Sequence, residues 1–278
     1  MSSGLIQGPP HQKIIKFLFS LFGISPVQTK KYQRLLDNLK ASEADFLILK
    51  KRFEILEKIS PEKAPFFVKH FKDSSSQFYQ DLFFASELAS YKEGFFVEIG
   101  ACDGVTLSNS IFFEKFLKWQ GIIVEPAKKW HPYLSKNRSA FIEKRAIGSV
   151  SGKILPFFEA EDPKLSTFTF LKNSDFQAEF RNKGKEYEVE TVSLNDLLDT
   201  YKAPKEIHYL SLDTEGSEYT ILQSFDFNSR KILSISCEHN FTPNRQMIFD
   251  LLTAQGYKRK FEDFSVCDDW YFLQSNLK

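Results

Sequence analysis

The sequence lacks the features that define several large protein classes. It has only three cysteines, Cys102, Cys237 and Cys267, and no two of them form a CxxC pair. We therefore expect no disulfide framework and no zinc site, and we predict reduced thiols in a cytoplasmic protein. No apolar run approaches the roughly 20 residues that a membrane span needs. The best apolar stretch near the N-terminus contains Lys16 and no cleavage site follows it, so a secretory signal is not expected.

The chain also lacks an excess of either charge. Its formal net charge is +1 and its pI is about 7.7, so composition predicts no nucleic-acid partner. What it does have is length and apolar content: 278 residues, of which 42% are hydrophobic. This is enough for one sizeable domain with an appendage, or for two small domains.

A change of pattern near residues 61–76 divides the sequence. We predict a helical N-terminal extension over residues 1–75 and a separate domain over 76–278. The first 36 residues carry five basic and no acidic side chains. A short amphipathic helix over 11–24 could pack on its own protein, or it could contact the inner face of a membrane as a peripheral helix.

Residues 30–60 show a heptad pattern. Its members follow one another at alternating spacings of three and four, which is typical of a coiled-coil seam. Further apolar residues beside the seam widen the stripe, which favours a helical bundle. A homo-oligomer formed through residues 30–60 and a helix folded back on its own domain both fit. The seam consists of Tyr32, Leu35, Leu39, Ser42, Phe46, Leu49, Phe53, Leu56 and Ser60.

From residue 77 onward, strand patterns and helix patterns alternate. This alternation predicts an α/β fold with a parallel sheet and helices on both of its faces, in which the last two strands could be antiparallel. Strands are expected at 95–99, 121–124, 140–147, 154–158, 187–192, 207–212, 231–237, 257–261 and 270–273. Helices are expected at 108–117, 194–201, 218–225 and 244–255.

Ligands of such sheets bind beyond the carboxyl ends of the strands. The first strand is followed by a turn with the spacing Gly100-x-x-x-Gly104. This is not the Gly-x-Gly-x-x-Gly spacing that holds a pyrophosphate. Glu98 and Asp103 make the rim acidic, which suits a cationic ligand. Glu125 follows the second strand, where a carboxylate can bind both ribose hydroxyls of a nucleoside, so we predict an adenosine-containing, positively charged ligand such as S-adenosylmethionine.

Acidic residues also follow the fourth and fifth predicted strands. Asp213, Glu215 and Glu218 come after one, and Glu238, His239 and Asn240 come after the next. Neighbouring strands lie about 4.8 Å apart, so these side chains could converge on one reacting group. Structural alternatives remain: Glu215 and Glu218 could favour a helix start, and His239 could be a core histidine bonded to a carbonyl.

At this point the sequence resembles the FkbM-type S-adenosylmethionine-dependent methyltransferases. The similarity spans about residues 76–278, and the helical N-terminal part lies outside it. It is carried by motifs that stand in order at the spacings of that family. They are SQFYQD (76–81), FFVEIGACDGVTLSN (95–109), GIIVEP (121–126), KNR (136–138), RAIGS (145–149), VSLNDLL (192–198), LDTEGSEYTIL (212–222) and CEHN (237–240).

The resemblance implies a class I methyltransferase fold, which is Rossmann-like and has a mostly parallel seven-stranded sheet with a reversed last strand. It also implies methylation of a hydroxyl oxygen, often on a sugar of a glycan. Segment 76–81 would help shape the pocket. Glu98, Gly100 and Asp103 would line the methionine end of the cofactor, and Glu125 would hold the ribose. The predicted cofactor-binding set is completed by Ala101, Ser108, Asn109, Pro126 and Ala146.

Methyl transfer to a sugar hydroxyl requires that the hydroxyl lose its proton as the new bond forms. Asp213 and His239 are the candidate bases, with Glu238 beside them as a further catalytic residue. In a second arrangement, Asp213, Glu215 and Glu238 would hold Mg²⁺, which would lower the pKa of the hydroxyl.

Two other functions remain open at this level. An NAD-dependent sugar oxidoreductase or epimerase also needs a glycine turn and a ribose-binding acid, but it should have the phosphate-type glycine spacing. A non-catalytic methyltransferase-like scaffold would have lost cofactor binding. The acceptor, expected to be a saccharide or glycan, would be selected by the insertion around residues 157–185, where Ser166, Thr167 and Phe168 could contact it.

Overall fold

The computed structural model describes residues 26–88 and 90–274, and the chain divides into two compact units, Met1–Pro61 and Glu62–Lys278. The predicted amphipathic helix over 11–24 lies outside the described residues. No helix in the described part of the chain is both long enough and apolar enough to cross a membrane. All three cysteines are free thiols.

The described part of the first unit is one long helix, α2 (Pro26–Lys58). Three residues of the predicted heptad seam are highly exposed on it: Phe46 at 66%, Leu49 at 52% and Phe53 at 66%. Leu47 and Ile48, beside the seam, are exposed as well. Such an apolar stripe on a solvent-facing helix is the feature that a helical partner would cover, and oligomerisation through it stays a prediction.

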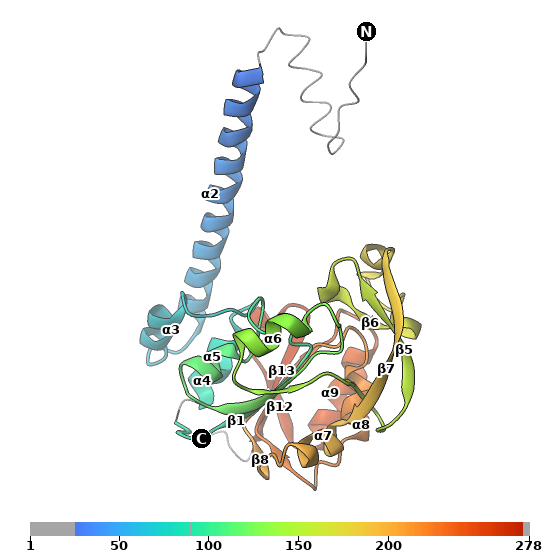
Figure 1. Ribbon diagram of the computed structural model, residues 1–278. Helices are drawn as coiled ribbons and strands as arrows, with labels where there is room; N and C mark the ends of the chain where they lie inside the picture. The colour runs from blue at the N-terminus through green and yellow to red at the C-terminus, as the bar shows by residue number, and fades with distance from the viewer. Residues whose placement is uncertain (1–25, 89, 275–278) are drawn as a thin grey trace, which may run out of the picture. The chain divides into compact units, whose positions relative to one another are not determined.

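The second unit is built on a seven-stranded sheet with the order β12-β13-β11-β9-β1-β2-β3. Figure 1 labels β1, β12 and β13 of this sheet. The sheet is mixed, because β13 runs antiparallel to both β11 and β12, whereas the remaining neighbours are parallel. The strand order reverses at β1, since β2 lies on one side of it and β9 on the other. The strands are β1 (Phe95–Ile99), β2 (Gln120–Val124), β3 (Phe141–Glu143), β9 (Tyr209–Leu212), β11 (Ser234–Glu238), β12 (Tyr257–Lys260) and β13 (Asp268–Leu273).

Helices cover both faces of this sheet, as the sequence predicts. On one face, Val97 and Ile99 of β1 share an apolar core with α7, α8 and α9. On the other face, aromatic rings of α4 and α5 pack on the strands, with Phe84 and Phe113 both against Tyr209 at centroid distances of 4.6 and 4.9 Å. The helices are α3 (Ala64–His70), α4 (Gln80–Leu88), α5 (Ile111–Lys115), α6 (His131–Asn137), α7 (Leu194–Thr200), α8 (Glu218–Ser224), α9 (Asn244–Ala254) and α10 (Glu262–Ser265).

An insertion between β3 and α7 forms a second, smaller sheet with the order β4-β7-β5-β6. Its strands are β4 (Ala146–Gly148), β5 (Ile154–Ala160), β6 (Thr167–Phe168) and β7 (Gly184–Ser193). The connections carry three short 3₁₀ turns, η1 (Pro163–Leu165), η2 (Thr169–Leu171) and η3 (Ala178–Arg181). A two-residue pair, β8 (Glu206–Ile207) with β10 (Lys231–Ile232), completes the strands.

Some predicted elements are shorter or broken. The strand expected over 140–147 is split into β3 and β4, because the carboxylate of Glu143 accepts hydrogen bonds from the backbone of Lys144 and Arg145 and turns the chain. The strands expected over 207–212 and 231–237 are each divided, between β8 and β9 and between β10 and β11. The helix expected from residue 108 begins at Ile111, whose backbone N–H donates to the Ser108 hydroxyl.

Candidate functional site

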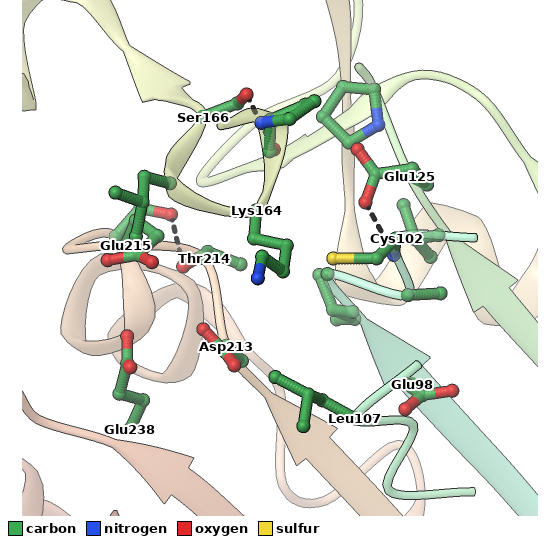
Figure 2. Close-up of a pocket in the computed structure, with 18 of the residues that line it drawn as sticks. Glu98, Cys102, Leu107, Glu125, Lys164, Ser166, Asp213, Thr214, Glu215 and Glu238 are labelled. Carbon is green, nitrogen blue, oxygen red and sulfur yellow. Dashed lines mark hydrogen bonds between the residues drawn. The ribbon is translucent and has the colours of Figure 1, made fainter. Parts of the chain in front are cut away.

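A pocket of about 350 Å³ lies at the carboxyl ends of β1, β2, β9 and β11 (Figure 2). This edge includes the place where the strand order reverses, which is where open α/β sheets bind ligands. The insertion closes the pocket from the other side through η1, β5 and β6. Its volume lies within the range of small-molecule and cofactor sites, roughly 300–1,000 Å³.

The turn after β1 requires a glycine at position 100. Gly100 has a φ of +92°, in the left-handed region that side chains disfavour. A Cβ atom there would stand 1.9 Å from the backbone oxygen of Asp213. The turn after β1 is therefore pressed against the turn after β9, and the missing side chain keeps that contact possible.

Glu98 organises the loop that follows this turn. Its carboxylate is buried and accepts hydrogen bonds from the hydroxyls of Ser108 and Ser110 at 2.9 and 2.7 Å and from the backbone of Asn109 at 2.5 Å. Arg138 forms a buried ion pair with it at 3.2 Å. Glu98, Ser108 and Asn109 also line the pocket, so the loop that they shape forms part of its wall.

Glu125 stands at the end of β2, across the pocket from Glu215 and Glu238 in Figure 2. One carboxylate oxygen accepts from the backbone of Cys102 at 2.8 Å and the other from the backbone of Ala127 at 2.7 Å. Each carboxylate oxygen can accept a second hydrogen bond, which leaves one position on each for a pair of ribose hydroxyls. Burial, reinforced by the negative charges of Asp213 and Glu159, raises the pKa of Glu125 to about 8.

The pocket lining includes an apolar wall, most of which belongs to one buried cluster with Ala127, two residues after Glu125. It includes Ala146 and Ile147 of β4, with Phe157 of β5 and Phe168 of β6. Pro126, directly after the acid, also lines the pocket. An apolar surface beside a carboxylate with free acceptor positions could take a nucleobase, because the ring could pack there while a ribose reached the carboxylate.

Three carboxylates meet on the opposite side. The oxygens offered by Asp213, Glu215 and Glu238 all lie within 4.8 Å of one another. Asp213 follows β9, and Glu238 ends the neighbouring strand β11, so adjacent parallel strands bring them together as the sequence predicts. Oε2 of Glu238 and Oδ1 of the adjacent Asn240 are buried and have no hydrogen-bond partner among the described residues.

The electrostatics of this cluster favour protonation. Burial, followed by repulsion from Glu218, raises the pKa of Asp213 to about 7. Burial and the neighbouring carboxylates also raise the pKa of Glu215 and of Glu238. A carboxyl group that titrates near neutral pH in a pocket has the protonation behaviour of a general base.

Arg181 holds the cluster in place. Its guanidinium is fully buried, binds both oxygens of Asp175 at 2.8 and 3.0 Å, and contacts Glu215 at 2.5 Å. It also donates to the carbonyl of Leu165 at 2.8 Å. Arg181 belongs to the insertion, so its ion pair with Glu215 ties the insertion to the acidic cluster.

Among the described residues that were predicted as catalytic, cofactor-binding or metal-binding, Asp103 and His239 are the two that do not line the pocket. The carboxylate of Asp103 accepts hydrogen bonds from the backbone N–H groups of Val105 and Thr106. Partial burial raises the pKa of Asp103, but these hydrogen bonds have the larger effect together and lower it. His239 accepts from the backbone of Phe241 through Nδ1 at 3.0 Å, and burial lowers its pKa. The geometry therefore favours Asp213 over His239 as the base.

Strained backbone marks the loops around the pocket. Cys102, Glu215 and Asn240 have φ values of +49°, +59° and +45°, follow β1, β9 and β11 respectively, and all line the pocket. Positive φ at a residue other than glycine costs energy and is concentrated at functional sites. The three loops that follow β1, β9 and β11 therefore share two features typical of a binding site: their position at the strand ends and a strained, positive φ.

The segments that were expected to shape the pocket contribute unequally. Ser166 and Phe168 line it, whereas Thr167 is buried and donates its hydroxyl to the carbonyl of Glu215 at 2.9 Å. From segment 76–81 only Gln77 reaches the lining. Asp81 of that segment is buried and accepts from the hydroxyls of Ser74 and Ser76 instead.

Sequence reasoning missed several lining residues, including Lys164 and Gln177, whereas Asn240, which it placed in the cluster at the strand ends, does line the pocket. It also missed Arg181, since nothing in a single arginine of a polar segment signals complete burial.

The tyrosine and lysine that nicotinamide-dependent sugar enzymes use are four residues apart, a spacing found here at Tyr201 and Lys205. The Tyr201 hydroxyl donates to the carbonyl of Ile142 at 3.0 Å, and neither residue lines the pocket. This pair therefore gives no support to an oxidoreductase.

A search among curated proteins gave no match to this chain. The family model for the methyltransferase FkbM domain matches residues 98–259, which is more than half of the chain. The match begins at Glu98 in β1 and includes the glycine turn, Glu125, the insertion and all three carboxylates of the acidic cluster. The chain therefore belongs to the FkbM methyltransferase domain family.

Proposed function

We propose that this protein is an S-adenosylmethionine-dependent O-methyltransferase that acts on a hydroxyl group of a sugar in a glycan or glycoconjugate. The observation that carries the proposal is one pocket with two different ends. Glu125 and an apolar wall form a nucleoside-binding end, and the carboxylate cluster around Asp213 forms the other.

The residues present fit this cofactor. Gly100 allows the turns after β1 and β9 to meet at the pocket lining, and Glu125 retains free acceptor positions for ribose. The acidic side suits an ammonium and a sulfonium group. When bound, S-adenosylmethionine supplies a methyl group on a positively charged sulfur. An oxygen nucleophile can attack this methyl carbon in line, and the sulfur is the leaving group.

Asp213 is placed to take the proton of the acceptor hydroxyl. It lines the pocket and follows β9 at the strand-order reversal. With a pKa of about 7, a substantial fraction is ionised at neutral pH and can accept a proton without a large energetic penalty. Pocket walls that hold both reactants in line would add to the rate.

The same cluster offers a second mode of action. Asp213, Glu215 and Glu238 supply hard oxygen ligands, and the unpartnered oxygens of Glu238 and Asn240 add further acceptors. Such ligands suit Mg²⁺, which would lower the pKa of a bound hydroxyl. Methyl transfer that stops with EDTA and returns with Mg²⁺ would favour this mode, and EDTA-resistant activity would favour Asp213 acting alone.

Aromatic side chains at the pocket support a sugar acceptor. Phe176 lines the pocket and is 58% exposed, and Phe241 lies beside it with a centroid distance of 6.2 Å. Exposed rings of this kind give the apolar faces of a sugar ring a surface to pack on. We expect Phe176→Ala to raise the acceptor KM several-fold and to leave cofactor affinity unchanged. Phe180→Ala is the matched control, since Phe180 is 60% exposed and is not part of the lining.

The experiment that tests the function is transfer of a labelled methyl group from S-adenosylmethionine to a panel of saccharides, glycans and nucleotide sugars. The proposal expects alkali-stable label on at least one acceptor, since an ether survives conditions that cleave a methyl ester. Label that alkali removes, or transfer to none of these acceptors, would contradict O-methylation of a sugar.

A further inference from the structure

The pocket lining carries one basic side chain among many acids. Its acidic members are Glu98, Glu125, Asp162, Asp213, Glu215 and Glu238. Lys164 is the single lysine, arginine or histidine among the described residues that line it. A single basic side chain in an acidic pocket can neutralise a neighbouring acid or bind an anionic group of a ligand.

Lys164 is not committed to a strong partner within the protein. Its ammonium lies 3.4 Å from Asp162, and the two side chains are 41% and 50% exposed. Exposed pairs of this kind contribute little to stability. The ammonium is therefore available to a ligand at little cost.

The backbone that carries Lys164 is held on both sides. The hydroxyl of Ser166 donates to the carbonyl of Pro163 at 2.7 Å, and buried Arg181 donates to the carbonyl of Leu165 at 2.8 Å. Figure 2 shows the side chain extending from the insertion into the pocket toward Asp213, between Glu215 and Cys102. Its position at the acidic end is thus set by a fixed turn.

The proposed cofactor brings an anion to this end. Its amino-acid part has an ammonium and a sulfonium, which the acidic side accommodates, and a carboxylate, which that side would repel. A buried or half-buried carboxylate needs a cation or several donors to offset its lost hydration. We propose that Lys164 binds the carboxylate of the cofactor's amino-acid part, an assignment that rests on the proposed function.

The experiment compares two ligands that differ only in this carboxylate. Calorimetric titration would use S-adenosylhomocysteine and its decarboxylated analogue, which keeps the nucleoside, the sulfur and the ammonium. We expect Lys164→Met to weaken binding of the first about 10-fold or more, the typical effect of losing a hydrogen bond to a charged group. Binding of the analogue should be unchanged or tighter, which also reports that the variant is folded.

Lys172→Met is the matched control. Lys172 belongs to the same insertion, lies over the ring of Phe158 at 4.2 Å and does not line the pocket. This variant should bind both ligands as the wild type does.

Three results would overturn the assignment. Unchanged affinity of Lys164→Met for S-adenosylhomocysteine would do so, even if the KM of a carboxylated acceptor rose, since Lys164 would then serve the acceptor. Equal weakening of both ligands would show that it acts on a shared group. A wild-type chain that binds neither ligand would refute the proposed function together with this assignment, which separates that failure from the other two.

Discussion

Asp213 carries the proposed chemistry at the residue scale, and its replacement gives the first prediction. Asp213→Asn keeps the shape of the side chain and removes its basicity. We expect the turnover number to fall on the order of 100- to 10,000-fold, the usual contribution of a positioned general base. Affinity for S-adenosylhomocysteine should change much less, because the nucleoside end is untouched.

Asp250→Asn is the control for that variant. Asp250 is exposed on α9 and lies outside the pocket lining. Near-normal turnover by Asp213→Asn would show that another group takes the proton, and Glu238 would then be the first candidate.

Glu125 gives a prediction about pH. With a pKa of about 8, its carboxyl is mostly protonated at pH 7 in the free pocket. Ribose hydroxyls donate hydrogen bonds and so favour the ionised form, which means that nucleoside binding should release a proton. Affinity should therefore rise with pH, by about tenfold between pH 7 and pH 9, and level off above the pKa.

The measurement uses 5′-methylthioadenosine, which has the ribose and lacks the amino-acid part that would approach Asp213. Titration in buffers of different ionisation enthalpy counts the protons released at each pH. 2′,3′-Dideoxyadenosine, which has no ribose hydroxyls, should release none. Proton uptake on binding, or pH-independent affinity for 5′-methylthioadenosine, would show that Glu125 does not receive the ribose.

Residue roles were predictable from sequence where a strand end fixes a side chain's direction. Glu125, Asp213 and Glu238 each stand at or directly after a buried strand, and all three line the pocket. His239 comes directly after the end of β11, but it does not line the pocket. Lys164 and Arg181 lie in an irregular insertion, where no periodicity indicates which side chains point inward.

At the scale of elements, the contact between the turns after β1 and β9 is the feature that holds the site together. Gly100→Ala would place a methyl group 1.9 Å from a backbone oxygen, at a φ of +92°. We expect the free energy of unfolding to fall by about 3 kcal/mol or more, because left-handed strain and a backbone clash add. Chemical denaturation measures this directly.

Gly152→Ala is the matched comparison. Gly152 has a φ of +77°, and a Cβ atom there would have nothing within 4 Å. Only the backbone strain remains, so the loss should be about 1–2 kcal/mol. Equal losses in the two variants would mean that the two turns separate easily, and that the pocket is not held by this contact.

Most strands of the main sheet were predictable because buried parallel strands leave near-continuous apolar runs, as in residues 95–99. The helices α4 and α6 were not among the predicted ones, in contrast to α7, α8 and α9. The breaks were not predictable from periodicity. β3 and β4 are separated by hydrogen bonds from the backbone of Lys144 and Arg145 to Glu143, a local interaction that leaves the apolar pattern intact. The second sheet likewise depends on long-range pairing between β5 and β7.

At the scale of the whole molecule, α2 carries the remaining prediction. The seam residues Phe46, Leu49 and Phe53 are exposed, and a second copy of the same helix is the partner that a heptad pattern fits. We expect the full chain to sediment as an oligomer at micromolar concentration. Phe46→Glu combined with Phe53→Glu should give a monomer that still binds S-adenosylhomocysteine.

The control places the charge on the side of α2 away from the seam. Ala44 is exposed and belongs neither to the seam nor to the apolar residues beside it, so Ala44→Glu should leave the oligomer intact. A wild-type chain that is monomeric at all concentrations would contradict self-association through residues 30–60.

The central claim is that the pocket at the ends of β1, β2, β9 and β11 binds S-adenosylmethionine. The most direct test is calorimetric titration of the full chain with S-adenosylhomocysteine, with NAD as the control. The account predicts micromolar binding of the first and none of the second. Binding of NAD alone would contradict it in favour of an oxidoreductase, and binding of neither would indicate a methyltransferase-like scaffold without cofactor.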